Sequence, residues 1–167
     1  NSLGIPILSI VTFLPLAGAA VLLFVRNAGL VRWIALAVTV ADFIVSIPIL
    51  LNFDRTTYHM QFVEHYQWIP SWNITYFMGV DGISVLFVFL AALLGWICVV
   101  ASWKAIEQRV KEFMIALLVM QTAMIGVFCA LDFFLFYLFW EAMLIPMYLI
   151  IGVWGGKNRI YAAFKFF

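Results

Sequence analysis

The sequence predicts an all-α protein, a polytopic bundle of helices that cross a membrane several times. Hydrophobic residues make up 67% of its 167 residues and charged residues make up 10%. Apolar runs about as long as a bilayer is thick also recur along the chain. A typical soluble domain has about 45–50% apolar and about 25% charged residues. A soluble fold of this composition would lack polar side chains for its surface, so lipid is the expected solvent.

Five apolar runs are long enough for helices that cross a bilayer, which requires about 20 residues. They cover about residues 5–25, 31–51, 82–102, 113–131 and 133–153, and a sixth begins near residue 160. Helices are expected because a segment in lipid must satisfy its backbone hydrogen bonds internally. The sequence lacks the alternating segments of about ten residues that are typical of membrane β-barrels. We therefore interpret residues 1–167 as a single membrane domain.

The connections between these runs carry most of the charge and predict an orientation. They are short except for residues 52–80, a loop that is rich in aromatic rings and also contains His59 and His65. Because aromatic rings favour the membrane–water boundary, we expect this loop to lie along one membrane surface. Eight basic residues fall on one side of the five-helix arrangement: Arg26, Arg32, Lys104, Arg109, Lys111, Lys157, Arg159 and Lys165. Arg55 falls on the other side. Because basic residues favour the inner side of a membrane, we expect the N-terminus and residues 52–80 outside.

Glu141 is the first candidate functional residue, because an ionisable group inside a membrane is costly. It is the ninth residue of the fifth run, about 13 Å from its start at the usual helical rise. Helical spacing places Tyr137 and Tyr148 on the same face, where their hydroxyls can orient the carboxyl group. Pro146 leaves the carbonyl of Ala142 without its helical hydrogen bond and makes this site more polar. We interpret Glu141 as a proton-transfer group.

Four other charged residues lie in or near the predicted helices. Asp42 is central in the second run, with Thr39 and Ser46 at helical spacing, and a structural hydrogen bond is the favoured role. Asp81 and Asp132 precede helices and are expected to cap them. Lys165 lies early in the sixth run, where it can extend to the nearer membrane surface.

Cofactor sites are not indicated. Cys98 and Cys129 lie in apolar runs without a partner pattern and are interpreted as small buried side chains. The predicted spans contain no histidine for a haem, and the sequence has no phosphate-binding glycine motif and no cysteine cluster for iron–sulfur centres. A net charge of +1 gives no indication of nucleic-acid binding. We expect no cofactor or metal in this chain.

Three stretches resemble one family of membrane proteins. They are YFMGVDGIS at residues 76–84, ALDFFLFYLFWEAMLIPM at 130–147 and IGVWGGKNRIY at 151–161. Together they resemble the M subunits of bacterial NADH:quinone oxidoreductase, respiratory complex I, whose mitochondrial counterpart is chain 4 of NADH dehydrogenase. The likeness runs from about residue 53 to the end, with a looser fit before it.

The resemblance implies a 14-helix antiporter-like fold with inverted repeats, placed in the membrane arm between two similar subunits. Such subunits translocate protons while NADH is oxidised and quinone is reduced elsewhere, with NAD, FMN, iron–sulfur clusters and quinone in the rest of the complex. It places Glu141 at the family's essential glutamate, which couples to a lysine on a broken seventh helix. The implied location is the bacterial cytoplasmic membrane, in preference to the mitochondrial inner membrane.

Other classes of membrane protein are alternatives to a complex I subunit. A subunit of a multisubunit sodium/proton antiporter and a membrane subunit of a hydrogenase share the implied fold. A structural anchor is disfavoured by Glu141, and a haem- or quinone-binding protein by the lack of histidine in the spans. The chain starts with Asn1 rather than Met and ends within an apolar run, so we expect it to be the N-terminal part of a longer protein. In that case Glu141 and Asp42 are expected to face lipid until further helices cover them.

Overall fold

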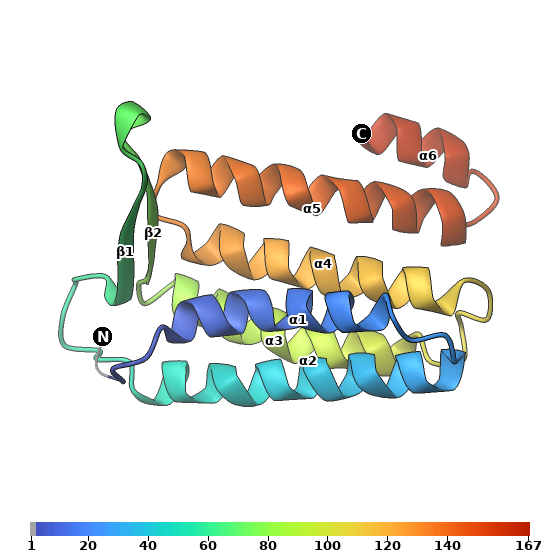
Figure 1. The fold of residues 1–167 in the computed structure, drawn as a ribbon, viewed down its shortest axis with the longest axis horizontal. Helices are drawn as coiled ribbons and strands as arrows, with labels where there is room; N and C mark the ends of the chain where they lie inside the picture. Colours follow the sequence, from blue (N-terminus) through green and yellow to red (C-terminus); the bar gives the residue numbers. More distant parts are fainter. Residues whose placement is uncertain (1–2) are drawn as a thin grey trace.

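The computed structural model describes residues 3–167, and Asn1 and Ser2 lie outside the described residues. Six α-helices and a two-stranded antiparallel sheet make up this described part of the chain (Figure 1). The helices are α1 (Ile7–Leu22), α2 (Ala28–Leu51), α3 (Ser84–Ala101), α4 (Val110–Cys129), α5 (Phe133–Trp154) and α6 (Arg159–Phe166). The strands are β1 (Gln61–Ile69) and β2 (Ile74–Val80), joined through the short helix η1 (Pro70–Trp72). The predicted membrane bundle is confirmed.

Among residues 3–167, four helices, α2 to α5, are long and apolar enough to cross a membrane. The first predicted span is shorter than expected, because α1 has 16 residues and ends in a turn at Leu22. At the other predicted boundaries the shifts are small and have local causes. Asn27 accepts hydrogen bonds from the amides of Gly29 and Leu30, so α2 starts at Ala28 rather than near residue 31. The sixth helix starts where it was predicted.

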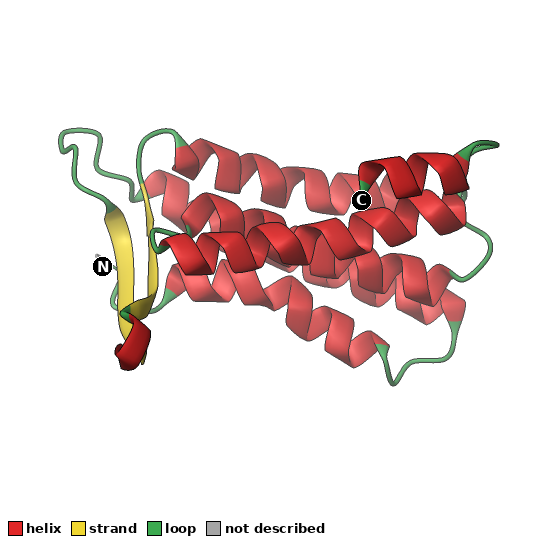
Figure 2. Cartoon of the chain, turned by 90° about the horizontal axis from the view of Figure 1, so that it is seen from above, coloured by secondary structure: helices red, strands yellow, loops and turns green. Residues whose placement is uncertain are grey.

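Helix α4 occupies the centre of the bundle, packed against α1, α2, α3 and α5 (Figures 1 and 2). Its neighbours approach closely where glycines face bulky groups. A Cβ on Gly126 of α4 would lie 2.5 Å from the Phe139 ring of α5, and one on Gly95 of α3 would lie 2.1 Å from the Gln121 side chain. Small residues at helix contacts are the usual means of close packing in membranes.

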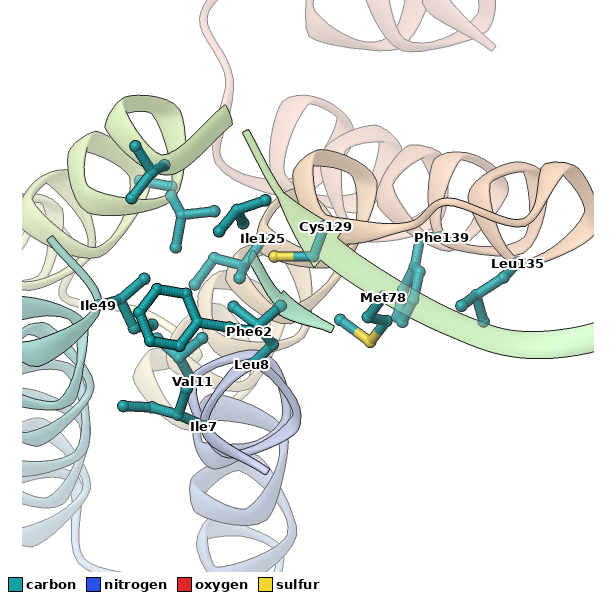
Figure 3. Close-up of a cluster of buried hydrophobic side chains, with 14 residues drawn as sticks. Ile7, Leu8, Val11, Ile49, Phe62, Met78, Ile125, Cys129, Leu135 and Phe139 are labelled. Atoms are coloured by element: carbon teal, nitrogen blue, oxygen red, sulfur yellow. The ribbon is translucent and has the colours of Figure 1, made fainter. Parts of the chain in front are cut away.

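The loop predicted at residues 52–80 instead contains the β-hairpin, which stands across one end of the bundle (Figure 1). Its strands pair with irregular register near Gln61, where Phe62 has a positive φ of 54°. Phe62 is nevertheless buried, and Figure 3 shows its ring near Ile49 of α2 and Val11 of α1. The turn uses Asn73 in the left-handed conformation, which asparagine tolerates. The hairpin is therefore packed onto the end of the bundle, and its position along a membrane surface stays a prediction.

The two ends of the bundle differ in charge. The connections α1–α2, α3–α4 and α5–α6 lie together at the end opposite the hairpin (Figure 1). They and the helix starts beside them carry seven of the eight basic residues that the sequence groups together, and Lys165 lies in the last turn of α6. We call this the basic end and the other the hairpin end. The predicted separation of charge is confirmed, whereas the side of the membrane that each end faces stays a prediction.

Candidate functional site

Helix α5 carries the main candidate, and it is the least enclosed of the four long helices. Glu141 is its single charged residue and stands near its middle, on the exposed face. Tyr137, one turn earlier, interacts with the Glu141 carboxyl group through its hydroxyl. The structure thus confirms the depth of Glu141 along the helix, while its role in proton transfer and the support from Tyr137 stay predictions.

The other residues predicted to support Glu141 lie further along α5. Pro146 is buried inside the helix, which continues past it to Trp154. Tyr148 contacts the rings of Phe164 and Phe167, with centroids 6.1 and 5.3 Å away, and so packs against α6. Tyr148 therefore anchors α6, and the structure gives it no contact with Glu141.

Asp132 sets the start of α5 and joins it to the hairpin. One carboxylate oxygen, Oδ1, accepts hydrogen bonds from the amides of Phe134 and Leu135 at 2.9 and 3.1 Å. The other, Oδ2, accepts from the amide and hydroxyl of Thr75 on β2 at 3.3 and 3.2 Å. Burial raises the pKa of Asp132, but the hydrogen bonds from Leu135, Thr75 and Phe134 together hold it below its usual value. The predicted capping role is confirmed.

The remaining charged candidates also have local partners. Asp81 accepts hydrogen bonds from the amides of Ile83 and Ser84 at 3.0 and 2.7 Å, and the bond from Ser84 is the main cause of its lowered pKa. It therefore satisfies the turn that leads into α3, as predicted. Lys165 lies exposed on α6, 5.6 Å from the centroid of the Tyr161 ring.

Asp42 is fully buried, so the expectation that it faces lipid is wrong. Its Oδ2 atom accepts a 2.9 Å hydrogen bond from the amide of Gln121 on α4. The predicted partners bond to their own helix instead, Thr39 to the carbonyls of Ala35 and Leu36, and Ser46 to that of Phe43. The structural role favoured for Asp42 is thus supported, but its partner lies on α4, which periodicity within the second run could not identify.

Sequence reasoning missed a buried acid at the hairpin end. Glu64 of β1 is 3% exposed, and its carboxylate accepts hydrogen bonds from the amide of Ser9, at 3.1 Å, and from the Ser9 hydroxyl. The hydroxyl of Tyr76 lies 2.6 Å from that of Ser9. Because Pro6 at the start of α1 provides no side-chain cap, Glu64 supplies one from the hairpin. The aromatic residues Phe62, Tyr66 and Trp68 lie at alternate positions in phase with Glu64. This period of two is the sequence pattern that would have indicated a strand here.

The two cysteines differ in burial. Cys129 is buried as predicted, but Cys98 is exposed on α3 and its predicted burial is wrong. Within residues 3–167, no group of three or more histidine, cysteine, aspartate or glutamate side chains is placed to hold a metal ion.

Comparison with known families decides the class of protein. Residues 10–127 match the family described as NADH-ubiquinone oxidoreductase chain 4, amino terminus. The chain belongs to this family. Residues 130–167, which include Glu141, match a second family, which is described as NADH:quinone oxidoreductase/Mrp antiporter, TM.

Individual relatives of the chain 4 family agree with this assignment. NADH-quinone oxidoreductase subunit M of Rhodobacter capsulatus is 55% identical over 96% of this chain and 32% of its own length. NADH-ubiquinone oxidoreductase chain 4 of Arabidopsis thaliana is 44% identical over 92% of this chain and 32% of its own. The chain thus spans about a third of the length of the curated relatives that it matches.

Solved structures share the fold. A chain of respiratory complex I from Thermus thermophilus with bound NADH has a TM-score of 0.79 and 25% identity, over 94% of this chain and 31% of that one. A chain of the membrane-bound sulfane sulfur reductase, an archaeal respiratory membrane complex, has a TM-score of 0.76 and 14% identity, over 97% and 33%. The second likeness is one of fold.

Proposed function

We propose that this chain 4 family member is part of an antiporter-like, proton-translocating subunit of NADH:quinone oxidoreductase. Membership of the family and the named relatives support this proposal. In it, NADH is oxidised and quinone is reduced elsewhere in the complex, and this chain carries no redox cofactor. Its partners are the other membrane-arm subunits, including two neighbouring antiporter-like subunits.

The position of Glu141 is the observation that carries the proposal. A carboxyl group at the middle of an apolar helix is costly in lipid, and acids in such positions generally face the interior of a bundle or a water-filled cavity. Glu141 instead lies on the exposed face of α5, beside the hydroxyl of Tyr137. This face is therefore suited to meet further helices, including the broken helix whose lysine the family resemblance implies.

Substitution of Glu141 in the full-length protein within the assembled complex tests the proposal. Glu141→Gln keeps the size of the side chain but cannot bind and release a proton near neutral pH, so NADH-driven proton uptake should fall close to background. Glu141→Asp should retain part of the activity. Uptake into membrane vesicles is followed with a pH-sensitive dye, and NADH oxidation and the amount of assembled complex are measured in parallel.

Asp42→Asn is the matched control, because an amide at position 42 still accepts the hydrogen bond from Gln121. This variant should pump at the normal rate. Normal pumping by Glu141→Gln would refute the assignment of the proton-transfer group. Loss of pumping by Asp42→Asn would show that the buried acid matters for transport.

The second family description names Mrp antiporters, so sodium exchange is the competing function. The same vesicles distinguish the two, because redox-driven proton uptake without sodium supports the oxidoreductase subunit. Strict dependence on sodium would favour the antiporter.

We also propose that the basic end faces the inside of a bacterial cytoplasmic membrane, because basic connections favour that side. An impermeant thiol reagent should label Gln61→Cys, at the hairpin end, from outside. It should label Gln108→Cys, at the basic end, from inside, and the reverse pattern would contradict this orientation.

A further inference from the structure

Two adjoining cavities lie at the basic end, between α4, α5 and α6. The first has a volume of about 330 Å³ and is lined by Gln108, Arg109, Gly152, Val153, Trp154 and Arg159. The second, of about 190 Å³, lies deeper along α5 and α6. Gly152 and Val153 line both, so the two cavities lie side by side.

The first cavity offers unused cationic donors. Arg159 donates one hydrogen bond, from Nη1 to the carbonyl of Val153 at 2.9 Å, which leaves four of its five N–H groups available. The backbone carbonyl of Arg109 accepts a hydrogen bond from the amide of Phe113, but its guanidinium group makes no hydrogen bond to any residue in the described range 3–167. The nearest acids in sequence, Glu107 and Glu112, do not line the cavity. Two guanidinium groups without a carboxylate favour an anion, and guanidinium geometry suits the oxygens of a phosphate.

Tertiary contacts hold the walls of this cavity in place. The indole Nε1 of Trp154 donates a 2.9 Å hydrogen bond to the carbonyl of Gln108, which ties the α3–α4 connection to the end of α5. The ring of Phe113 packs edge-on against Trp154 with centroids 5.2 Å apart. Arg109 directly follows Gln108, so these contacts fix its backbone next to Arg159 across the cavity.

The second cavity is apolar and lies on the membrane side of the first. Its remaining lining residues are Tyr148, Leu149, Ile160, Ala163 and Phe164. A free phosphate or a nucleotide would have no use for an apolar extension of this kind. A molecule with a phosphate at one end and a hydrocarbon chain at the other fits both parts.

We propose that these adjoining cavities bind an anionic phospholipid, with its phosphate between Arg109 and Arg159 and an acyl chain between α5 and α6. The site lies at the boundary where α4 begins and α5 ends, the depth at which lipid headgroups meet a membrane protein. A bound lipid would bridge the α3–α4 connection and the start of α6.

Photo-crosslinking in the full-length protein within the assembled complex tests the site. The probe is phosphatidylglycerol with a diazirine in one acyl chain, compared with phosphatidylcholine that carries the same chain. Mass spectrometry then maps the adducts. We expect the phosphatidylglycerol probe to label residues 149–164 at least about fivefold more than the phosphatidylcholine probe, because a nearby basic residue contributes about that factor.

Arg109→Gln removes no hydrogen bond of the fold, so it tests the site without a loss of structure. It should reduce the adduct about fivefold, and Arg109→Gln with Arg159→Gln about thirtyfold. Lys104→Gln, an exposed basic residue outside the cavity, is the matched control and should leave the yield unchanged. Equal labelling by the two probes, an unchanged yield in Arg109→Gln, or an equal loss in Lys104→Gln would overturn the proposal. Full competition by inorganic phosphate would identify a free-anion site instead.

Discussion

Removal of the Glu64 carboxylate should weaken the attachment of the hairpin to α1. In the structure this side chain is 3% exposed and accepts two hydrogen bonds from Ser9, one from the backbone amide and one from the hydroxyl. Glu64→Ala leaves both donors without that acceptor. The amide belongs to the first turn of α1, where no residue of the helix itself can accept its hydrogen bond.

The magnitude follows from these two donors. An unsatisfied buried donor costs about 1–3 kcal/mol, and because Ser9 is half-buried the lower part of that range applies to each. Glu64→Ala should therefore destabilise the protein by about 2–3 kcal/mol, which is seen as a lower unfolding midpoint. Glu64→Gln keeps an acceptor and loses the attraction of a negative charge to the helix N-terminus, worth about 0.3–1 kcal/mol.

Thermal unfolding of the purified full-length protein in detergent, followed by circular dichroism, measures these differences. Tyr76→Phe is a useful control, because it removes only the hydroxyl that lies 2.6 Å from that of Ser9. We expect the loss of stability to be largest for Glu64→Ala and small for Glu64→Gln and Tyr76→Phe. Equal midpoints for Glu64→Ala and the native protein would show that the carboxylate does not secure α1.

Three further predictions concern other parts of the fold. Burial is the main cause that raises the pKa of Tyr76 to about 12, so this side chain ionises in the unfolded protein first, near pH 10. The free energy of unfolding should therefore fall as the pH rises from about 10 to 12. Tyr76→Phe should lessen that fall in an alkaline unfolding titration. Gln121→Leu leaves the buried Asp42 without its donor and should cost about 1–3 kcal/mol in thermal unfolding, whereas Asp42→Asn should cost less than about 1 kcal/mol. Gly126→Ala places a methyl group against the Phe139 ring and should lower the free energy of unfolding by about 1–3 kcal/mol. The measurement is the thermal unfolding midpoint, and an unchanged midpoint would mean that α4 and α5 move apart without strain.

Local features of the fold were predictable from the sequence because their causes lie within a few residues. Apolar length predicted α2 to α5, and an acid just before a helix predicted the caps at Asp81 and Asp132. The depth of Glu141 along α5 followed in the same way from helical rise. Each of these inferences needs only neighbouring residues and the geometry of one helix.

Features that depend on distant parts of the chain were not predictable. The partner of Asp42 is Gln121, 79 residues later, and periodicity within α2 pointed instead to its own turns. The aromatic side chains of residues 52–80 are typical of a membrane boundary and equally typical of β-strands. Because the sequence analysis adopted the first interpretation, it predicted neither the hairpin nor the role of Glu64. Cys98 lies in an apolar run, but its exposure depends on which face of α3 meets other helices.

The central position of α4 has a consequence for biosynthesis. A ribosome releases α1, α2 and α3 into the membrane before α4, so for that interval α2 carries Asp42 without the Gln121 amide that later pairs with it. Insertion of α4 supplies this amide and also the surface against which the three earlier helices pack. A nascent chain that stalls before residue 110 therefore leaves Asp42 in the bilayer without the amide that later pairs with it.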